Sequence, residues 1–338
     1  MMRKLDRFRG CLIGGAAGDA LGYAVEFLGE NQIFKKYGST GITAYALRNG
    51  AAEISDDTQM TLFTASGLLS GAANGAESCL CSVQRMYQCW YRTQTESYPL
   101  RDQNTDTWLL TVPELFSCRA PGTTCMSAIE QGANGSVTEP INNSKGCGGV
   151  MRVAPIGLFF CDKPVSYAET DLLGAQAAAL THGHELGYIP AAALVHIVRT
   201  VAEKDLPLKN AVEEAVAAMN DLFPQVRFIA DFSAIMKKAI RLSETEEDDL
   251  EAIHQLGEGW VGEEALAIAV YCALKYRNDF DMALRAAVNH NGDSDSTGAV
   301  TGNILGAALG YQAIPQKYKE RLELHDVVMK AAEELYHG

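Results

Sequence analysis

Two clusters of acidic and hydroxyl side chains stand far apart in the sequence and have the composition of a metal site. They are Ser55-Asp56-Asp57-Thr58 and Asp293-Ser294-Asp295-Ser296, with Thr297 directly after the second. Hard divalent cations such as Mg²⁺, Mn²⁺ and Ca²⁺ prefer oxygen ligands, and neither cluster contains histidine or cysteine. The pattern predicts that both clusters meet in one divalent-metal site.

Helix capping is the competing explanation for these carboxylates. Asp56 followed by Gln59 fits a capping box, and Asp293 or Asp295 could cap a second helix. Capping explains one carboxylate of a pair but not both pairs in full. Gly292 lets the chain turn sharply before the second cluster. The two interpretations are compatible, because one carboxylate can cap while its neighbour binds metal.

Glu26 is the third acidic candidate. It is flanked by Val25 and Phe27. A carboxylate in apolar surroundings can have a raised pKa and serve as a general acid or base. On the sequence alone, an ordinary surface glutamate is an equally good interpretation.

A glycine-rich segment at 144–152 is the candidate anion-binding loop. It reads Ser144-Lys145-Gly146-Cys147-Gly148-Gly149-Val150-Met151-Arg152. Consecutive glycines expose N–H groups that can hold phosphates, although the Walker pattern is absent. A nucleophilic role for Cys147 is disfavoured, since no base stands beside it. His182 either orients a substrate or is a satisfied polar group, and its surroundings lack the HExxH zinc pattern.

The elements that must position these residues are helices. Apolar residues recur at a period near 3.6, and the sequence shows no sustained two-residue alternation. Helices are expected at 5–24, 57–71, 76–92, 107–117, 165–180, 187–203, 208–220, 229–242, 262–276, 280–288, 296–310 and 325–336. A short extended piece is expected at 41–45. We expect an all-α protein with one compact domain over residues 1–338.

Polar or glycine- and proline-rich breaks separate these helices. They fall at 31–54, 93–106, 119–149, 162–164 and 243–258. The acidic run at 244–249 lacks the spacing of an EF-hand, so a solvated loop is expected there in preference to a calcium site.

Two rows of glycines mark a pair of helices. Gly10, Gly14, Gly18 and Gly22 recur every four residues, as do Gly298, Gly302, Gly306 and Gly310. A glycine inside a helix costs about 1 kcal/mol relative to alanine. Rows of small residues permit close backbone approach. We expect the two helices to lie at the centre of the bundle, against each other, with breaks at these glycines as the alternative.

Composition narrows the class of partner. The chain has 338 residues, 47% of them hydrophobic, and a formal charge of −14. This charge disfavours a nucleic-acid backbone or an anionic membrane as the main partner. The nine cysteines are odd in number and form no CxxC pair, which argues against a zinc ribbon and favours a reducing cytoplasm. A signal peptide and a membrane-spanning segment are not expected.

In their order along the chain, these motifs resemble the ADP-ribosylglycohydrolase family, which includes the dinitrogenase-reductase-activating glycohydrolases. The resemblance spans nearly the whole sequence. It rests on 9–14 (RGCLIG), 18–26 (GDALGYAVE), 55–58 (SDDT), 146–155 (GCGGVMRVAP), 181–182 (TH), 260–266 (WVGEEAL) and 292–297 (GDSDST).

The resemblance implies an orthogonal bundle of helices, two Mg²⁺ or Mn²⁺ ions, and cleavage of a glycosidic bond to ADP-ribose. It assigns the metals to Ser55, Asp56, Asp57, Asp293, Asp295 and Ser296, and acid/base chemistry to Glu26 and Asp295. It assigns ADP-ribose to Ser144, Gly146, Cys147, Gly148, Gly149, Met151 and His182. Members often have asparagine where this chain has Cys147, so a side-chain contact there is in doubt.

The sequence does not say what carries the ADP-ribose. Arginine is favoured on family breadth, and serine, an ester or a small molecule stays open. The alternatives are a catalytically inactive relative that binds ADP-ribose, or a metal-dependent phosphohydrolase acting on nucleotides.

Overall fold

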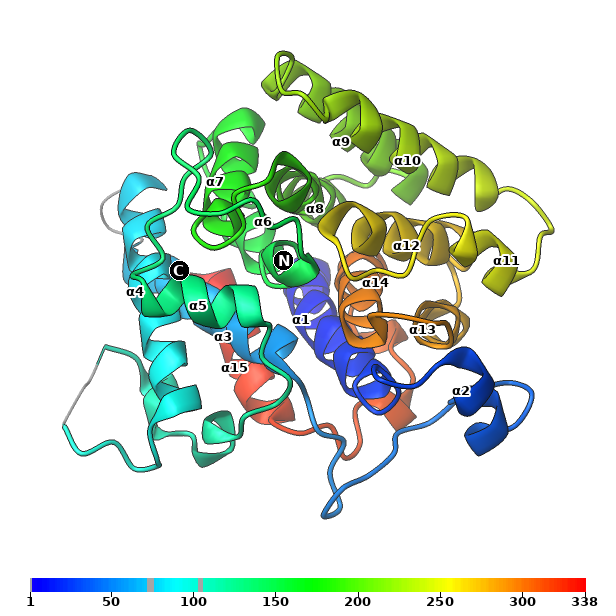
Figure 1. Ribbon diagram of the computed structural model, residues 1–338, viewed down its shortest axis with the longest axis horizontal. Coiled ribbons are helices and arrows are strands. Elements are labelled where there is room, and N and C mark those ends of the chain that lie inside the picture. The colour runs from blue at the N-terminus through cyan, green and yellow to red at the C-terminus, as the bar shows by residue number, and fades with distance from the viewer. Residues whose placement is uncertain (1, 72–75, 103–105) are drawn as a thin grey trace.

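The protein, seen in a computed structural model, is built from helices (Figure 1). The structure describes residues 2–71, 76–102 and 106–338. In these ranges the α-helices are α1 (Met2–Gly22), α2 (Glu30–Tyr37), α3 (Asp56–Gly71), α4 (Ala76–Thr95), α5 (Thr123–Glu130), α6 (Ala154–Phe159), α7 (Tyr167–Ala179), α8 (Glu185–Glu203), α9 (Leu208–Leu222), α10 (Ile229–Leu242), α11 (Asp249–His254), α12 (Gly262–Lys275), α13 (Phe280–Val288), α14 (Ser294–Leu309) and α15 (His325–His337). The same ranges contain isolated β-bridges but no strand. The all-α prediction is therefore confirmed.

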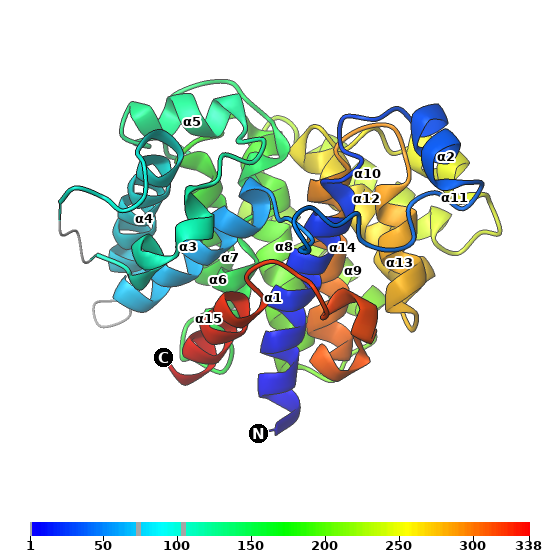
Figure 2. The ribbon, with the colours of Figure 1, turned by 90° about the horizontal axis from the view of Figure 1, so that it is seen from below.

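Helices α1 and α14 cross the centre of the molecule side by side and antiparallel (Figures 1 and 2). A Cβ atom added to Gly10 would lie 2.3 Å from the carbonyl oxygen of Gly306. One added to Gly14 would lie 2.3 Å from that of Gly302, and one added to Gly18 would lie 1.9 Å from that of Gly298. Real Cβ atoms do not approach this closely. The expectation that the glycine rows face each other is confirmed.

The remaining helices enclose this pair. Helix α8 packs against α6, α7, α9, α12 and α14, and α3 packs against α4. Every α8 residue from Leu186 to Ala202 is buried, so this helix is enclosed by its neighbours on all sides. Nowhere in the described ranges is a helix both long enough and apolar enough to span a membrane.

Eleven of the twelve expected helices are present. The prediction of a helix at 107–117 is wrong. That segment forms two 3-10 helices, η2 (Trp108–Thr111) and η3 (Pro113–Phe116). Val112 between them is extended, at φ −97° and ψ 107°. A residue that precedes proline is disfavoured in the α conformation, so Pro113 divides the segment.

Three of the expected breaks contain short helices. Helix α2 begins at Glu30 and occupies the first part of 31–54, α5 lies within 119–149 and α11 within 243–258. Helix α6 was also not expected. The extended piece at 41–45 is irregular instead. These helices have six to eight residues, too few for a helical period to emerge from sequence. The acidic run at 244–249 contributes a cap, because Asp248 accepts from the Leu250 N–H at 3.0 Å.

Candidate active site and metal centre

The close contact between α1 and α14 ends where three acidic side chains meet. A Cβ atom added to Gly22, the last residue of α1, would lie 2.1 Å from the carbonyl oxygen of Ser294. The chain then turns, and the Glu26 N–H donates to the Gly22 carbonyl at 2.9 Å. As a result, carboxylate oxygens of Glu26, Asp293 and Asp295 lie within 4.8 Å of one another.

The start of α14 is built by a glycine and a cap. Gly292 has φ +121°, and a Cβ there would lie 1.9 Å from the carbonyl oxygen of Glu258, so a residue other than glycine does not fit. Asp293 is the N-cap, and it accepts from the Ser296 N–H at 3.2 Å. Helix α14 begins at Ser294, two residues before the expected start at 296, so Asp295 lies inside its first turn. Asp293 thus has the capping role that the sequence suggested for this cluster.

The start of α3 is capped differently from the prediction. The Ser55 hydroxyl accepts from the Asp57 N–H at 3.2 Å. The expected capping box between Asp56 and Gln59 is wrong, because the Gln59 amide turns away to the indole of Trp90 and the carbonyl of Ser117. The serine hydroxyl serves as the cap, which leaves both carboxylates of this cluster free for other contacts.

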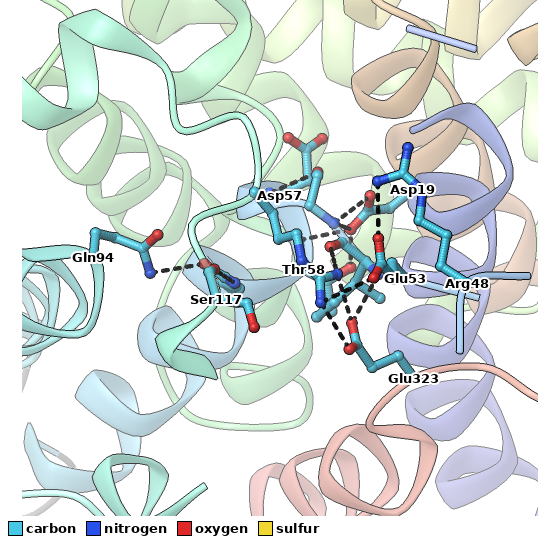
Figure 3. Close-up of polar contacts among 12 residues, drawn as sticks. Asp19, Arg48, Glu53, Asp57, Thr58, Gln94, Ser117 and Glu323 are labelled. Carbon is cyan, nitrogen blue, oxygen red and sulfur yellow. Dashed lines mark hydrogen bonds and ion pairs between the residues drawn. The ribbon is translucent and has the colours of Figure 1, made fainter. Parts of the chain in front are cut away.

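Asp19 on α1 anchors this turn and was missed from the sequence. Its carboxylate accepts from the Ser55 N–H at 2.9 Å and the Thr58 N–H at 3.1 Å, and also from the Thr58 hydroxyl. Figure 3 shows Asp19 beside Thr58. The side chain is fully buried. The GDALG motif that contains Asp19 was noted, but nothing in it indicated a contact with residues 55–58.

A partly buried ion pair supports the same turn from the other side. Arg119 donates to both carboxylate oxygens of Glu323 at 3.1 Å, and its own carbonyl accepts from the Asp56 N–H at 3.1 Å. Glu323 also accepts from the Ile54 N–H at 3.1 Å. Bidentate pairs of this kind fix geometry. The 54–58 turn is therefore held between α1 and the segment before α15 (Figure 3).

The two acidic clusters open into one cavity of about 240 Å³, here called the carboxylate cavity. It is lined by Glu26, Asp56, Asp57, Ala120, Gly122, Thr123, Thr124, Cys125, Gly146, Cys147, Gly148, Met151, His182, Trp260, Asp293, Asp295 and Ser296. It joins residues about 270 positions apart in the chain. No lysine or arginine of the described ranges lines it.

Three residues of the expected site lie outside this lining. Ser55 is fully buried beneath the cavity as the cap of α3. A Cβ on Gly149 would lie 2.8 Å from the Gly187 carbonyl oxygen, so this glycine makes room for α8. Ser144 stands beside the cavity, 3.1 Å from the hydroxyl of Thr124. Thr123 and Thr124, at the start of α5, line the cavity and were not anticipated, although a Gly-Thr-Thr sequence is compatible with a helix start.

The carboxylates destabilise one another's charged forms. Burial raises the pKa of Glu26 to about 10, and Asp295 and Asp56 add to the effect. Burial, followed by the charge of Asp295, raises the pKa values of Asp56 and Asp57 well above their usual range. Burial also raises the pKa of Asp293 to about 6. Such a set of acids needs bound cations or protons for compensation.

The donor atoms fit a hard cation. Within the part of the chain that the structure describes, Glu26 Oε2 and Asp57 Oδ2 are buried and have no hydrogen-bond partner. Buried polar atoms are nearly always paired, so unpaired carboxylate oxygens in a cavity call for a ligand. The carboxylate and hydroxyl groups around these atoms offer oxygen ligands, which Mg²⁺ and Mn²⁺ favour.

Cys147 departs from this oxygen set. It begins the short helix η4 (Cys147–Gly149), and its thiol donates to Asp293 Oδ2 at 2.7 Å. The thiol therefore directly contacts Asp293, one of the candidate metal ligands. Burial, followed by the charge of Asp293, raises its pKa well above the usual range. A protonated thiol is a poor nucleophile, consistent with the sequence interpretation.

His182 lies in the cavity wall as a neutral side chain. Burial lowers its pKa to about 3, with a further contribution from Arg152. Its Nδ1 lies 2.8 Å from the Thr181 hydroxyl, which in turn accepts from Arg152 at 2.6 Å. Arg152 is fully buried and stacks over the ring of Tyr87 at 4.3 Å. The last residue of the glycine-rich segment thereby fixes the orientation of His182.

The proteins that this chain resembles in sequence and fold share one family. The sequence profile described as ADP-ribosylglycohydrolase matches residues 1–338. The ADP-ribosyl-[dinitrogen reductase] glycohydrolase of Rhodospirillum rubrum is 26% identical over 94% of this chain and 91% of its own length. ADP-ribosylhydrolase ARH3 of Gallus gallus is 22% identical over 98% and 92%. A solved structure titled ADP-ribosylglycohydrolase-related protein complex superposes with a TM-score of 0.68 at 23% identity, covering 100% of this chain and 99% of the other.

Proposed function

Because the chain belongs to the ADP-ribosylglycohydrolase family, we propose that the carboxylate cavity hydrolyses the glycosidic bond of ADP-ribose attached to a protein side chain or small molecule. Membership of this family supports an activity that hydrolyses ADP-ribosyl groups. The observation that carries the assignment of the site is the meeting of Glu26, Asp293 and Asp295 within 4.8 Å in a cavity also lined by Asp56 and Asp57.

Two divalent ions, Mg²⁺ or Mn²⁺, are proposed as cofactors. Asp56, Asp57, Asp293, Asp295 and Ser296 line the cavity and would hold them. Ser55 would contribute mainly by capping α3, since its hydroxyl already accepts from the Asp57 N–H. Bound ions of this kind orient ribose hydroxyls and lower the pKa of a water.

The chain's own groups have separable tasks. Glu26, with Asp295 beside it, would take the proton of the water that attacks the anomeric carbon. An oxocarbenium-like transition state is stabilised by nearby negative charge, which the carboxylates supply. The Gly148 N–H and the start of α5 would position the diphosphate, because exposed N–H groups and helix N-termini bind anions. Gly146 and Cys147 would contribute as cavity lining, since their N–H groups already donate to the Ser144 hydroxyl and the Trp260 carbonyl. Met151 and neutral His182 would close the wall around the ribose.

The preferred linkage is proposed to be N-glycosidic, to arginine. No basic side chain of the described ranges lines the cavity, so a guanidinium leaving group meets no like-charged side chain there. A relative that is 24% identical to this chain, Tri1 of Pseudomonas putida, is by its name an ADP-ribosylarginine hydrolase. Serine-linked ADP-ribose is the second substrate to test.

One assay tests the whole proposal. The protein is incubated with defined ADP-ribosylated arginine, serine and small-molecule substrates, with Mg²⁺, Mn²⁺ or chelator, and free ADP-ribose is quantified. We expect metal-dependent release of ADP-ribose, and loss of both turnover and metal binding in Asp293→Ala and Asp295→Ala. Wild-type rates with unchanged metal content in these variants would remove the residues from the site. Release of AMP or phosphate would identify a phosphohydrolase, and binding without release would identify an inactive relative.

A further inference from the structure

An exposed aromatic pair stands at the edge of the carboxylate cavity. Phe27 is 71% exposed and Trp260 is 41% exposed, although most large apolar side chains of the described ranges are buried. Their rings are stacked, with centroids 6.5 Å apart and planes 23° apart. Scattered exposed apolar residues need no explanation, but an adjacent aromatic pair beside a reactive site marks a contact surface.

The backbone of both residues belongs to the site. Trp260 lines the cavity, and its carbonyl accepts from the Cys147 N–H at 3.2 Å. The next residue, Val261, forms a bridge with Gly146. Phe27 directly follows Glu26 in the turn fixed on Gly22. The backbone of both residues is therefore fixed at the cavity edge.

The position of the pair relates it to the group that leaves. Phe27 is adjacent in sequence to Glu26, whose carboxylate lies with those of Asp293 and Asp295. If the proposed function holds, the anomeric carbon lies at these carboxylates. The adenine is separated from that carbon by two riboses and a diphosphate. A surface next to Glu26 is accordingly closer to the substituent on the anomeric carbon than to the adenine.

We propose that Phe27 and Trp260 form an aromatic wall that contacts the leaving group and selects a planar cationic one, the guanidinium of arginine, over the aliphatic linkage of serine. The inference rests on the proposed function. Aromatic faces carry negative potential and attract a cation placed over them. A guanidinium also stacks flat on an aromatic ring. A serine methylene and its ether oxygen offer neither interaction, so the wall distinguishes the two linkages.

The kinetic test compares two substrates across matched variants. Phe27→Ala and Trp260→Ala should raise KM for an ADP-ribosyl-arginine peptide roughly 5- to 30-fold, the range expected for a partly desolvated cation–π contact of about 1–2 kcal/mol. KM for an ADP-ribosyl-serine peptide and the Kd of free ADP-ribose should change less than about two-fold. Phe27→Tyr and Trp260→Phe should retain wild-type KM. Leu47→Ala, which removes an exposed side chain outside the cavity lining, is the control.

A binding readout separates this inference from the proposed function. Trp90 is fully buried and Trp108 is partly buried, so a spectrum difference between Glu26→Gln and Glu26→Gln/Trp260→Phe isolates the emission of Trp260. The arginine-linked peptide should quench that emission, and free ADP-ribose should not. Equal losses for both linkages, or weakened ADP-ribose binding in the alanine variants, would overturn the aromatic wall. Failure of the wild type to release ADP-ribose from any substrate would overturn the proposed function, whereas quenching by the arginine peptide would still support the wall.

Discussion

Gly14→Ala tests the contact on which the site depends. The added methyl would lie 2.3 Å from the carbonyl oxygen of Gly302 and 3.0 Å from its carbon. Both atoms belong to the backbone of α14, so no flexible side chain can move to relieve the overlap. The two helices must separate along part of their length.

The expected cost follows from two opposing terms. Forcing an extra methyl into a packed interior costs typically about 1–3 kcal/mol, and a backbone obstacle places this case at the upper end. Alanine recovers about 1 kcal/mol of helix propensity. The net loss is about 2 kcal/mol. Since unfolding entropy is about 2.1 cal/mol/K per residue, a chain of 338 residues should lose roughly 3 °C in Tm.

Thermal and urea unfolding of purified variants would measure this change. Gly29→Ala is the control, because Gly29 has φ −67° and a Cβ there would have its nearest neighbour at 3.4 Å. That control should lose less than about 1 kcal/mol, through its weaker capping of α2. A rise in stability for Gly14→Ala, as expected for a glycine in a free helix, would refute the close approach of α1 and α14.

Three further changes probe the site. Glu26→Gln should lower turnover by on the order of 10²- to 10⁴-fold with no loss of Tm, the range for loss of a general acid or base; a normal rate would exclude Glu26 from the chemistry. Asp19→Asn replaces the buried acceptor of the Ser55 and Thr58 N–H groups and should cost about 2 kcal/mol in urea unfolding, together with weaker Mn²⁺ binding in calorimetry. Because burial lowers the pKa of His182 to about 3, the unfolded chain takes up a proton below about pH 6.5 that the folded chain does not. Stability should fall by about 2 kcal/mol between pH 8 and pH 5 from this group, and the pH slope of His182→Gln should lack that contribution.

The sequence indicated the helical class and the central pair because both depend on regular spacing. The glycines at 10, 14, 18 and 22 and at 298, 302, 306 and 310 repeat with the period of a helix face, so their register could be inferred before any contact was known. Helices of six to eight residues, such as α5 and α11, contain too few turns for such a period. Pro113 shows the opposite case, in which one local rule divides an apparently helical segment.

The supporting contacts of the site were beyond the reach of sequence patterns. Asp19 contacts the 55–58 turn through the packing of α1 against α3, and Arg119 meets Glu323 across about 200 residues. Such partners are fixed by tertiary geometry alone. The exposed pair of Phe27 and Trp260 illustrates the same limit, since each aromatic residue is unremarkable in its own segment.

The antiparallel glycine pair also has a consequence for synthesis of the chain. Gly22 contacts Ser294, so about 270 residues must be made after α1 before its partner helix exists. At a synthesis rate of roughly 5–20 residues per second, the residues that contact α1 are made on the order of 15 to 55 seconds after it. Contacts between such distant segments also slow folding. A nascent chain therefore carries its first acidic cluster for most of its synthesis without the second, and the carboxylate cavity cannot form until α14 has emerged.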